Sequence, residues 1–279
     1  MNRRKIWPFR AAYPQHPDDE KPQAPEEGPR RKTDPNRRAR RITLMTRIIQ
    51  PALLLAIIAM VLAPALTPSF TGYDPGTFPV RIERPAIQPA GYAFSIWGLI
   101  YLWLLIHAAF GLWKRRDDPA FLRPSLPLLV SGLLGSLWLA IAGQAPLTAT
   151  AVILVMGGLA LLAYLRADAT QDRWLLAAPL AIYAGWLTAA CGVSVGVILA
   201  GYGILSNTAS ALLMLTVVIL IAVWVQAKRP SMPVYGTTVV WAAIGVVVAN
   251  WVDTPTVAYA AIGGGAAMAV WTLFTLRRA

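Results

Sequence analysis

The chain alternates between long apolar stretches and short polar segments. Eight stretches of about 20 residues each contain no internal Asp, Glu or Lys: 47–66, 92–113, 125–143, 147–165, 174–200, 210–227, 234–251 and 256–276. A helix needs roughly 20 apolar residues to cross a hydrocarbon core about 30 Å thick, and the stretches lack the period-2 alternation of barrel strands. We therefore predict an all-α polytopic membrane bundle of about eight transmembrane helices.

The overall composition agrees with a membrane protein. Of the 279 residues, 57% are hydrophobic and 14% are charged, whereas a soluble domain is typically about a quarter charged. Residues 174–227 contain no charged side chain. The formal net charge of +12 therefore does not indicate a nucleic-acid-binding protein. The expected partners are membrane lipids and a hydrophobic small molecule.

The positions of the basic residues predict the orientation. Short cytoplasmic loops accumulate Lys and Arg. Of the 25 Lys and Arg, 23 fall before or at the start of the first span, in the loops after the second, fourth and sixth spans, or at the C-terminus. Only Arg81 and Arg84 lie in a loop on the other side. We expect both termini in the cytoplasm and the protein in the inner or plasma membrane.

Residues 1–46 form a separate region with seven prolines and dense charge. Such a composition cannot bury enough apolar surface to fold, so we predict a disordered cytoplasmic tail. Its basic cluster beside the first span, 37–41, either contacts anionic lipid or only fixes the topology. A signal peptide cleaved near 63–65 is disfavoured because a polar leader of more than 40 residues precedes the apolar run and a proline lies inside the site.

The spans contain few groups suited to catalysis or metal binding. Cys191 is the single cysteine, which excludes an intramolecular disulfide and a CxxC metal site, and we interpret it as a packing residue. Residues 192–196 match G-x-S-x-G, but this motif is catalytic only at a strand-to-helix turn. Gly192 and Gly196 are better interpreted as a surface of small residues for close helix packing. No catalytic or metal-binding residue is predicted.

His107 is the one histidine within a span. It lies four residues after Trp103, on the same helix face, and no buried carboxylate is predicted to orient it. We interpret it as an interhelical hydrogen-bonding residue. Ligand contact and a single axial metal bond remain the alternatives.

Aromatic residues are unusually frequent within the spans. Four of the 11 tryptophans fall near span ends, where indoles commonly anchor at the headgroup level: Trp113, Trp174, Trp251 and Trp271. Four others lie inside spans: Trp97, Trp103, Trp138 and Trp186. In the second span an aromatic stripe recurs at intervals of three and four residues through Phe94, Trp97, Tyr101 and Leu104. Such a stripe is either packing or the wall of a pocket for a flat apolar molecule.

Residues 84–101 read RPAIQPAGYAFSIWGLIY. This segment resembles the entry to the second helix of the translocator protein / tryptophan-rich sensory protein (TspO/MBR) family, approximately K-P-x-x-x-P-P-x-x-x-F-x-x-V-W-x-x-L-Y. The chain is one residue short between Phe94 and Trp97. Weaker matches follow at 134–138, with Gly135 in place of an Asn, and at 179–190, where Trp186 and Ala190 keep the family spacing.

The resemblance implies a five-helix TspO/MBR-like bundle over 47–200, enlarged by three additional helices within 201–279. Family members bind porphyrins and sterols in a pocket between helices and are described as receptors, sensors or transporters. The matching positions imply a ligand-binding set: Phe94, Trp97, Tyr101, Trp138, Trp186 and Ala190. No cofactor is required, and a porphyrin or haem-like molecule is the implied ligand. At the pocket mouth, Arg81 and Arg84 either meet ligand carboxylates or are neutralised by Glu83 and Asp74.

The leading hypothesis is a non-enzymatic membrane protein that senses or transports a flat apolar ligand such as a porphyrin, sterol or isoprenoid. A structural or assembly protein without a ligand is the alternative, and a lipid-modifying enzyme is less favoured because the spans lack an acid–base pair. The glycine run at 263–265 allows close helix contact within the chain or between two copies. A homodimer is therefore one of the two arrangements that the sequence allows.

Overall fold

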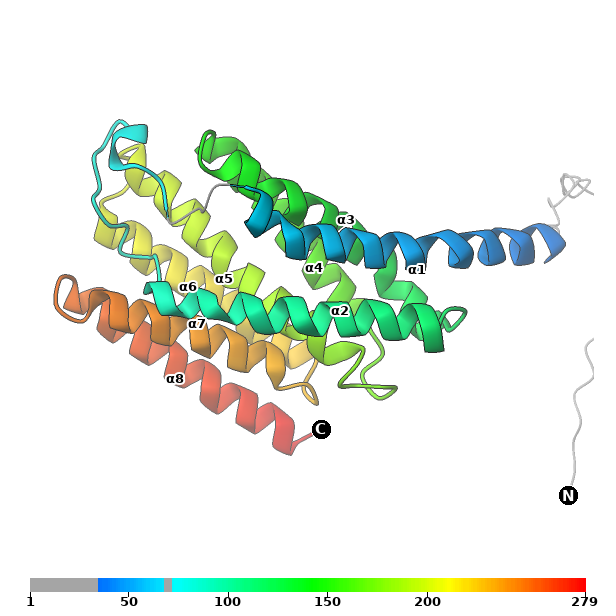
Figure 1. Ribbon diagram of the computed structural model, residues 1–279. Helices are drawn as coiled ribbons and strands as arrows, with labels where there is room; N and C mark the ends of the chain where they lie inside the picture. Colours follow the sequence, from blue (N-terminus) through cyan, green and yellow to red (C-terminus); the bar gives the residue numbers. More distant parts are fainter. Residues whose placement is uncertain (1–34, 68–71) are drawn as a thin grey trace, which may run out of the picture.

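The computed structural model describes residues 35–67 and 72–279, with side chains from residue 48 onward. The described part is an all-helical bundle, without strands (Figure 1). It contains eight α-helices: α1 Pro35–Leu66, α2 Ile96–Lys114, α3 Pro119–Ala142, α4 Pro146–Arg166, α5 Ala177–Gly201, α6 Asn207–Lys228, α7 Val234–Asn250 and α8 Pro255–Arg277. Two short 3₁₀ helices, Pro75–Thr77 and Gly91–Ser95, lie between α1 and α2. The predicted helical class is confirmed, and each of the eight predicted apolar stretches is helical.

The first helix is longer than expected. It begins at Pro35, so residues 35–46, which the sequence assigned to a disordered tail, are helical. Proline is favoured in the first turn of a helix, and the Arg-rich segment after it contains no glycine or further proline before Pro51. The disorder predicted for residues 35–46 is therefore wrong. The rest of the predicted tail, 1–34, lies outside the described residues.

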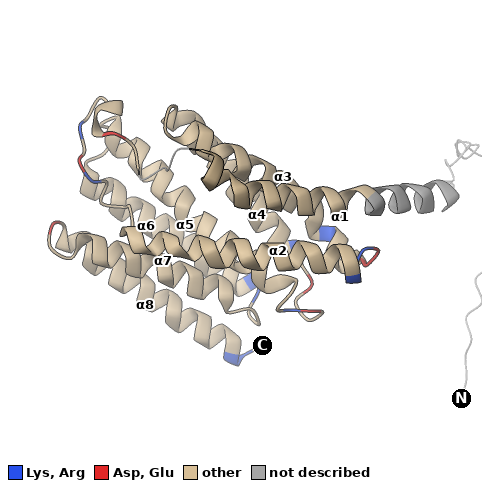
Figure 2. Ribbon diagram, viewed as in Figure 1, with Lys and Arg blue, Asp and Glu red and all other residues tan. Residues whose placement is uncertain are grey.

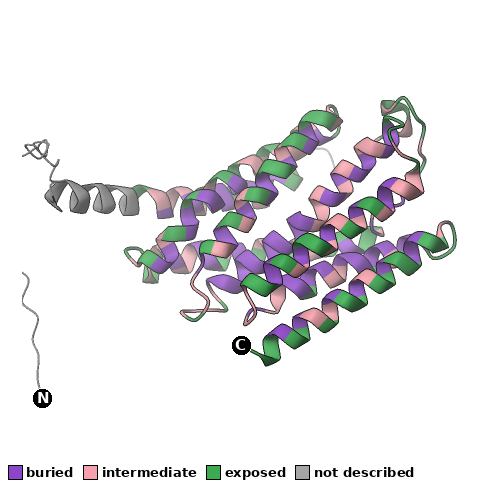
Figure 3. Cartoon of the chain, turned by 180° about the vertical axis from the view of Figure 1, so that it is seen from behind, coloured by how far each residue is buried: buried purple, intermediate pink, exposed green. Residues whose placement is uncertain are grey.

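Seven of the described helices are long and apolar enough to cross a membrane, and α7, with 17 residues, is a shorter apolar helix. Nevertheless α7 runs the whole way between the two ends of the bundle. Its first residues follow the α6–α7 turn at 229–233, whereas Asn250 at its other end hydrogen-bonds Ala86 in the first loop. Large apolar side chains such as Leu55, Leu220 and Val270 are more than 60% exposed on the outer faces (Figure 3). These faces are suited to lipid.

Helix α5 is the centre of the bundle. It packs against α4 on one side and against α6 and α7 on the other, and α2 also contacts it. The helices α1, α3 and α4 form one group, and α6, α7 and α8 form a second. Since α5 contacts both groups, the bundle is continuous across residue 200.

Small residues on α5 allow this central position. A Cβ atom at Gly192 would lie 2.4 Å from Cγ2 of Val218 on α6, and one at Gly196 would lie 2.9 Å from Cγ2 of Ile87 in the first loop. Both distances are shorter than van der Waals contact, so a larger residue would force these side chains to shift. The interpretation of Gly192 and Gly196 as a close-packing surface is confirmed. Gly192 packs against helix α6, and Gly196 packs against the first loop.

Charged side chains gather at the helix ends and in the loops, and the helix centres are nearly free of them among the described residues (Figure 2). At one end the turn after α2 contacts the α4–α5 loop, where Nε of Arg115 donates to Oδ2 of Asp172 at 2.8 Å. Arg173 in the same loop donates to the carbonyl of Ser231 in the α6–α7 turn at 2.6 Å. The loops predicted to carry the basic residues thus share one end of the bundle. That this end faces the cytoplasm stays a prediction.

Candidate functional site

A cavity of about 570 Å³ lies in the half of the bundle next to the first loop. All helices except α8 contribute to its wall, together with the loop segment that precedes α2. Its lining is almost entirely aliphatic and aromatic. The volume falls within the range of roughly 300–1,000 Å³ that is common for small-molecule sites.

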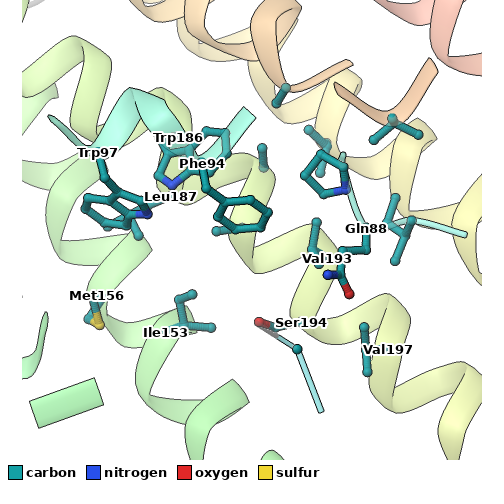
Figure 4. Close-up of a pocket in the computed structure, with 18 of the residues that line it drawn as sticks. Gln88, Phe94, Trp97, Ile153, Met156, Trp186, Leu187, Val193, Ser194 and Val197 are labelled. Atoms are coloured by element: carbon teal, nitrogen blue, oxygen red, sulfur yellow. The ribbon is translucent and has the colours of Figure 1, made fainter. Parts of the chain in front are cut away.

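The six residues that the resemblance singled out all line this cavity: Phe94, Trp97, Tyr101, Trp138, Trp186 and Ala190. The Phe94 and Trp186 rings meet edge to face, with centroids 5.6 Å apart at 85°. Trp97 meets Trp186 at 6.4 Å and stacks on Tyr101 at 5.1 Å. Figure 4 shows Phe94, Trp97 and Trp186 grouped on one side of the cavity. The structure therefore brings residues from α2 and α5 into a single aromatic wall.

Local structure explains this grouping. Phe94 lies at the end of the 3₁₀ helix Gly91–Ser95, and Trp97 and Tyr101 follow on α2 one turn apart. Residues four apart on a helix share a face, which also places Ala190 above Trp186 on α5. Trp138 is oriented by its own hydrogen bond, because its Nε1 donates to the carbonyl of Ala149 at 2.9 Å.

Three buried tyrosines lie in the core of the bundle and do not line the cavity themselves. The hydroxyl of Tyr183 hydrogen-bonds Ser131 at 2.9 Å, and that of Tyr235 hydrogen-bonds Thr188 at 3.0 Å. Tyr164 stacks on Tyr235 with ring centroids 5.6 Å apart. The hydroxyls of Tyr183 and Tyr235 therefore have hydrogen-bond partners within the bundle.

Residues 84–91, called the strap below, form the boundary of the cavity on the side of the first loop. The backbone N–H of Ala86 donates to Oδ1 of Asn207 at 2.8 Å, and Nδ2 of Asn207 donates back to the carbonyl of Arg84 at 3.0 Å. Nδ2 of Asn250 donates to the carbonyl of Ala86 at 2.8 Å. The two asparagines, at the ends of α6 and α7 nearest the strap, fix its backbone.

Further contacts hold the strap over the cavity. The backbone N–H of Ala90 donates to the carbonyl of Gly245 at 2.9 Å. The side chain of Ile87 is buried in an apolar cluster with Val197, Met214 and Val246. The strap contributes Ile87, Gln88, Pro89 and Gly91 to the cavity lining.

Sequence reasoning missed the contribution of the C-terminal helices. The wall includes Val218 and Ile219 of α6 and Val239, Ala242 and Val246 of α7. An apolar helix face gives no signal that distinguishes a cavity wall from ordinary packing. The two asparagines, Asn207 and Asn250, are polar residues at the ends of apolar spans and were the available signal for the strap contacts.

The two arginines expected at the mouth do not line the cavity. Nε of Arg81 pairs with Oε1 of Glu83 at 2.7 Å, and this contact raises the pKa of Arg81. Nη1 of Arg84 lies 3.7 Å from Oδ2 of Asp253 in the loop before α8. The ion pair with Glu83 agrees with the alternative in which loop carboxylates neutralise these arginines.

His107 and Cys191 have packing roles. Nδ1 of His107 lies 2.8 Å from the carbonyl of Leu175, and its ring stacks on Phe121 at 5.5 Å. Since a carbonyl only accepts, Nδ1 carries the proton, and the hydrogen-bonding interpretation of His107 is confirmed. Sγ of Cys191 donates to the carbonyl of Ile153 at 3.2 Å. Within the described residues, no group of three or more His, Cys, Asp and Glu is placed to hold a metal ion.

A polytopic helix bundle with an aromatic cavity beneath a fixed loop defines a class of multi-pass membrane protein. A family model described as TSPO-like protein matches residues 48–274, most of the chain. The chain therefore belongs to the TSPO-like family, which confirms the resemblance seen in the sequence, and the match continues through α6, α7 and α8. Comparison with curated proteins and with solved structures finds no match.

Proposed function

We propose that this protein binds a flat, largely apolar ligand in the aromatic cavity and senses or transports it without chemical conversion. The observation that carries the proposal is the cavity of about 570 Å³ with the edge-to-face wall of Phe94, Trp97 and Trp186. Aromatic faces of this kind suit planar apolar molecules such as porphyrins, sterols and isoprenoids.

A non-enzymatic role is supported by the character of the wall. Acid–base chemistry needs a titratable side chain within reach of the substrate, usually a His, Asp, Glu or Lys. The residues that line the cavity include none of these four types. A structural or assembly protein without a ligand is the competing function, and a ligand-binding test separates the two.

The first experiment is a titration of the purified protein with octaethylporphyrin, a porphyrin without carboxylates, followed by the shift of the porphyrin absorption band. We expect saturable binding that is lost in the double variant Trp97→Ala and Trp186→Ala, because the variant removes two side chains of the aromatic wall. The matched control is Trp113→Ala with Trp251→Ala, since both indoles are more than half exposed at helix ends. Equal binding by both double variants would contradict the site, and no binding by the unaltered protein would favour the structural role.

A further inference from the structure

The cavity carries no charge on its wall. The residues that line it include no Asp, Glu, Lys, Arg or His, and Arg81 and Arg84 are engaged outside it. An ionised group that enters an apolar cavity loses its hydration, and without a counter-charge this loss is strongly unfavourable. The wall therefore disfavours a ligand that would place a carboxylate or phosphate inside.

Besides Tyr73 and Tyr101, the lining includes two further polar side chains, those of Gln88 and Ser194. Figure 4 shows the amide of Gln88 and the hydroxyl of Ser194 directed toward the same space from the strap and from α5. Among the described residues, no hydrogen bond engages either group. By contrast, Thr188 on the same helix donates to the carbonyl of Ala184 at 2.8 Å. Gln88 and Ser194 thus keep their hydrogen-bonding capacity for an occupant of the cavity.

The position of Gln88 is fixed by its neighbours. Ile87 is 3% exposed, Pro89 is buried against Gly245, and the backbone on either side of Gln88 is held by Asn207, Asn250 and the carbonyl of Gly245. The fixed backbone therefore holds the amide within reach of the cavity before any ligand arrives, although the side chain keeps its own rotamer freedom.

We propose that the ligand is an uncharged, largely apolar molecule with one hydroxyl or carbonyl group, and that this group hydrogen-bonds the Gln88 amide, with Ser194 beside it. The inference rests on the proposed function and narrows it. An amide both donates and accepts, so it binds either a hydroxyl or a carbonyl. Gln88 is then the residue that determines specificity, and the aromatic wall supplies affinity for the rest of the molecule.

The test uses three probes with flat apolar bodies: pyrene, which has no polar group, all-trans-retinol, which has a hydroxyl, and all-trans-retinoate, which has a carboxylate. Binding is followed by energy transfer from tryptophan in detergent at pH 8. We expect retinol to bind at least roughly tenfold more tightly than retinoate because of the uncompensated charge. The affinity of retinoate should rise as the pH is lowered and its carboxyl group is protonated, whereas that of retinol should stay constant.

The variant Gln88→Met keeps the size of the side chain and removes the amide. Loss of one hydrogen bond should weaken retinol binding by about three- to tenfold and leave pyrene binding unchanged. The matched control is Gln144→Leu, because Gln144 is exposed in the α3–α4 turn near the same end and does not line the cavity.

The outcomes separate the two proposals. If pyrene binds and is displaced by retinol, but retinoate binds as tightly as retinol or Gln88→Met leaves retinol binding unchanged, the inference is wrong and the proposed function stands. If none of the three probes binds, both fail. Thermal unfolding of Gln88→Met, together with its retained pyrene binding, shows that any loss of retinol binding is not a loss of fold.

Discussion

The carboxylate of Asp168 stabilises the α4–α5 loop through local hydrogen bonds. It accepts from the backbone N–H groups of Thr170 and Gln171, both at 2.9 Å, and from the hydroxyl of Thr170 at 2.8 Å. These bonds favour the ionised form and lower the pKa of Asp168 to about 2. This loop also contains Asp172 and Arg173, which join it to the turns after α2 and α6. One exposed carboxylate thereby supports contacts among three loops.

The lowered pKa of Asp168 determines how its contribution to stability depends on pH. The folded-state pKa lies below the ordinary value of about 3.9, so the stabilisation is present above that value and is lost as the pH falls toward 2. We expect Asp168→Ala to lower the thermal unfolding temperature in detergent at pH 7 and the difference to shrink below pH 4. Asp117→Ala, at an exposed position in the turn after α2, is the control. A pH-independent difference would contradict the role of the carboxylate.

At the same scale, tryptophans that look alike in the sequence have different roles. Trp97 lines the cavity, whereas Trp103, six residues later, donates from Nε1 to the carbonyl of Trp174 at 2.8 Å and stacks on its ring. At about 100° per residue, six residues turn the side chain to another face of α2. Periodicity predicts this separation. Which face meets the cavity depends on how α2 packs against α5.

Among the elements, α5 depends most on close approach. A Cβ atom at Gly185 would lie 2.9 Å from the backbone oxygen of Tyr235 and 2.9 Å from Cβ of Thr238 on α7, neither of which can rotate away. Gly158 on α4 has no atom within 4 Å of the corresponding position. The two glycines therefore form a natural comparison between a packed and an open site.

We expect Gly185→Ala to destabilise the bundle by about 1–3 kcal/mol, because the added methyl forces α5 and α7 apart. Gly158→Ala should leave stability unchanged or raise it slightly, since alanine is the better helix former. Thermal unfolding in the same detergent measures both. A similar effect of the two substitutions would show that the α5–α7 contact adapts to the extra methyl.

The C-terminal helices α6 and α7 hold the strap in place through Asn207 and Asn250. The K-P-like pair and Pro89 were visible in the sequence, and so was the helix start that follows them. The partners of the strap, Asn207 and Asn250, are more than 100 residues away along the chain. Contacts of that separation are set by packing of α6 and α7 on α5, and no local pattern reports them.

For the whole molecule, the even number of described helices places the start of α1 and the end of α8 on the same side of the bundle. The loops after α2, α4 and α6 lie at that end, and the strap and the turn after α3 lie at the other. The excess of Lys and Arg at the first end predicts that it faces the cytoplasm.

Labelling of single cysteines tests this orientation. In a Cys191→Ala background, we expect Arg277→Cys to react with an impermeant thiol reagent only after the membrane is opened. Gln144→Cys should react in intact cells. The substitution at Cys191 removes the protein's single native thiol. The reverse pattern of reactivity would overturn the predicted topology.

The sequence by itself determined the helical class and the eight apolar helices, because apolar length is a local property. Spacings of three and four residues placed Phe94, Trp97 and Tyr101 on one helix face, and the family resemblance added Trp138, Trp186 and Ala190. Tertiary structure alone decided that α6 and α7 complete the cavity, that Asn207 and Asn250 fix the strap, and that Gln88 faces an uncharged wall. Tertiary structure also shows that Arg81 and Arg84 do not line the cavity. The physical reason is that lipid-facing, packed and cavity-facing apolar surfaces have the same composition, so only the arrangement of the helices distinguishes them.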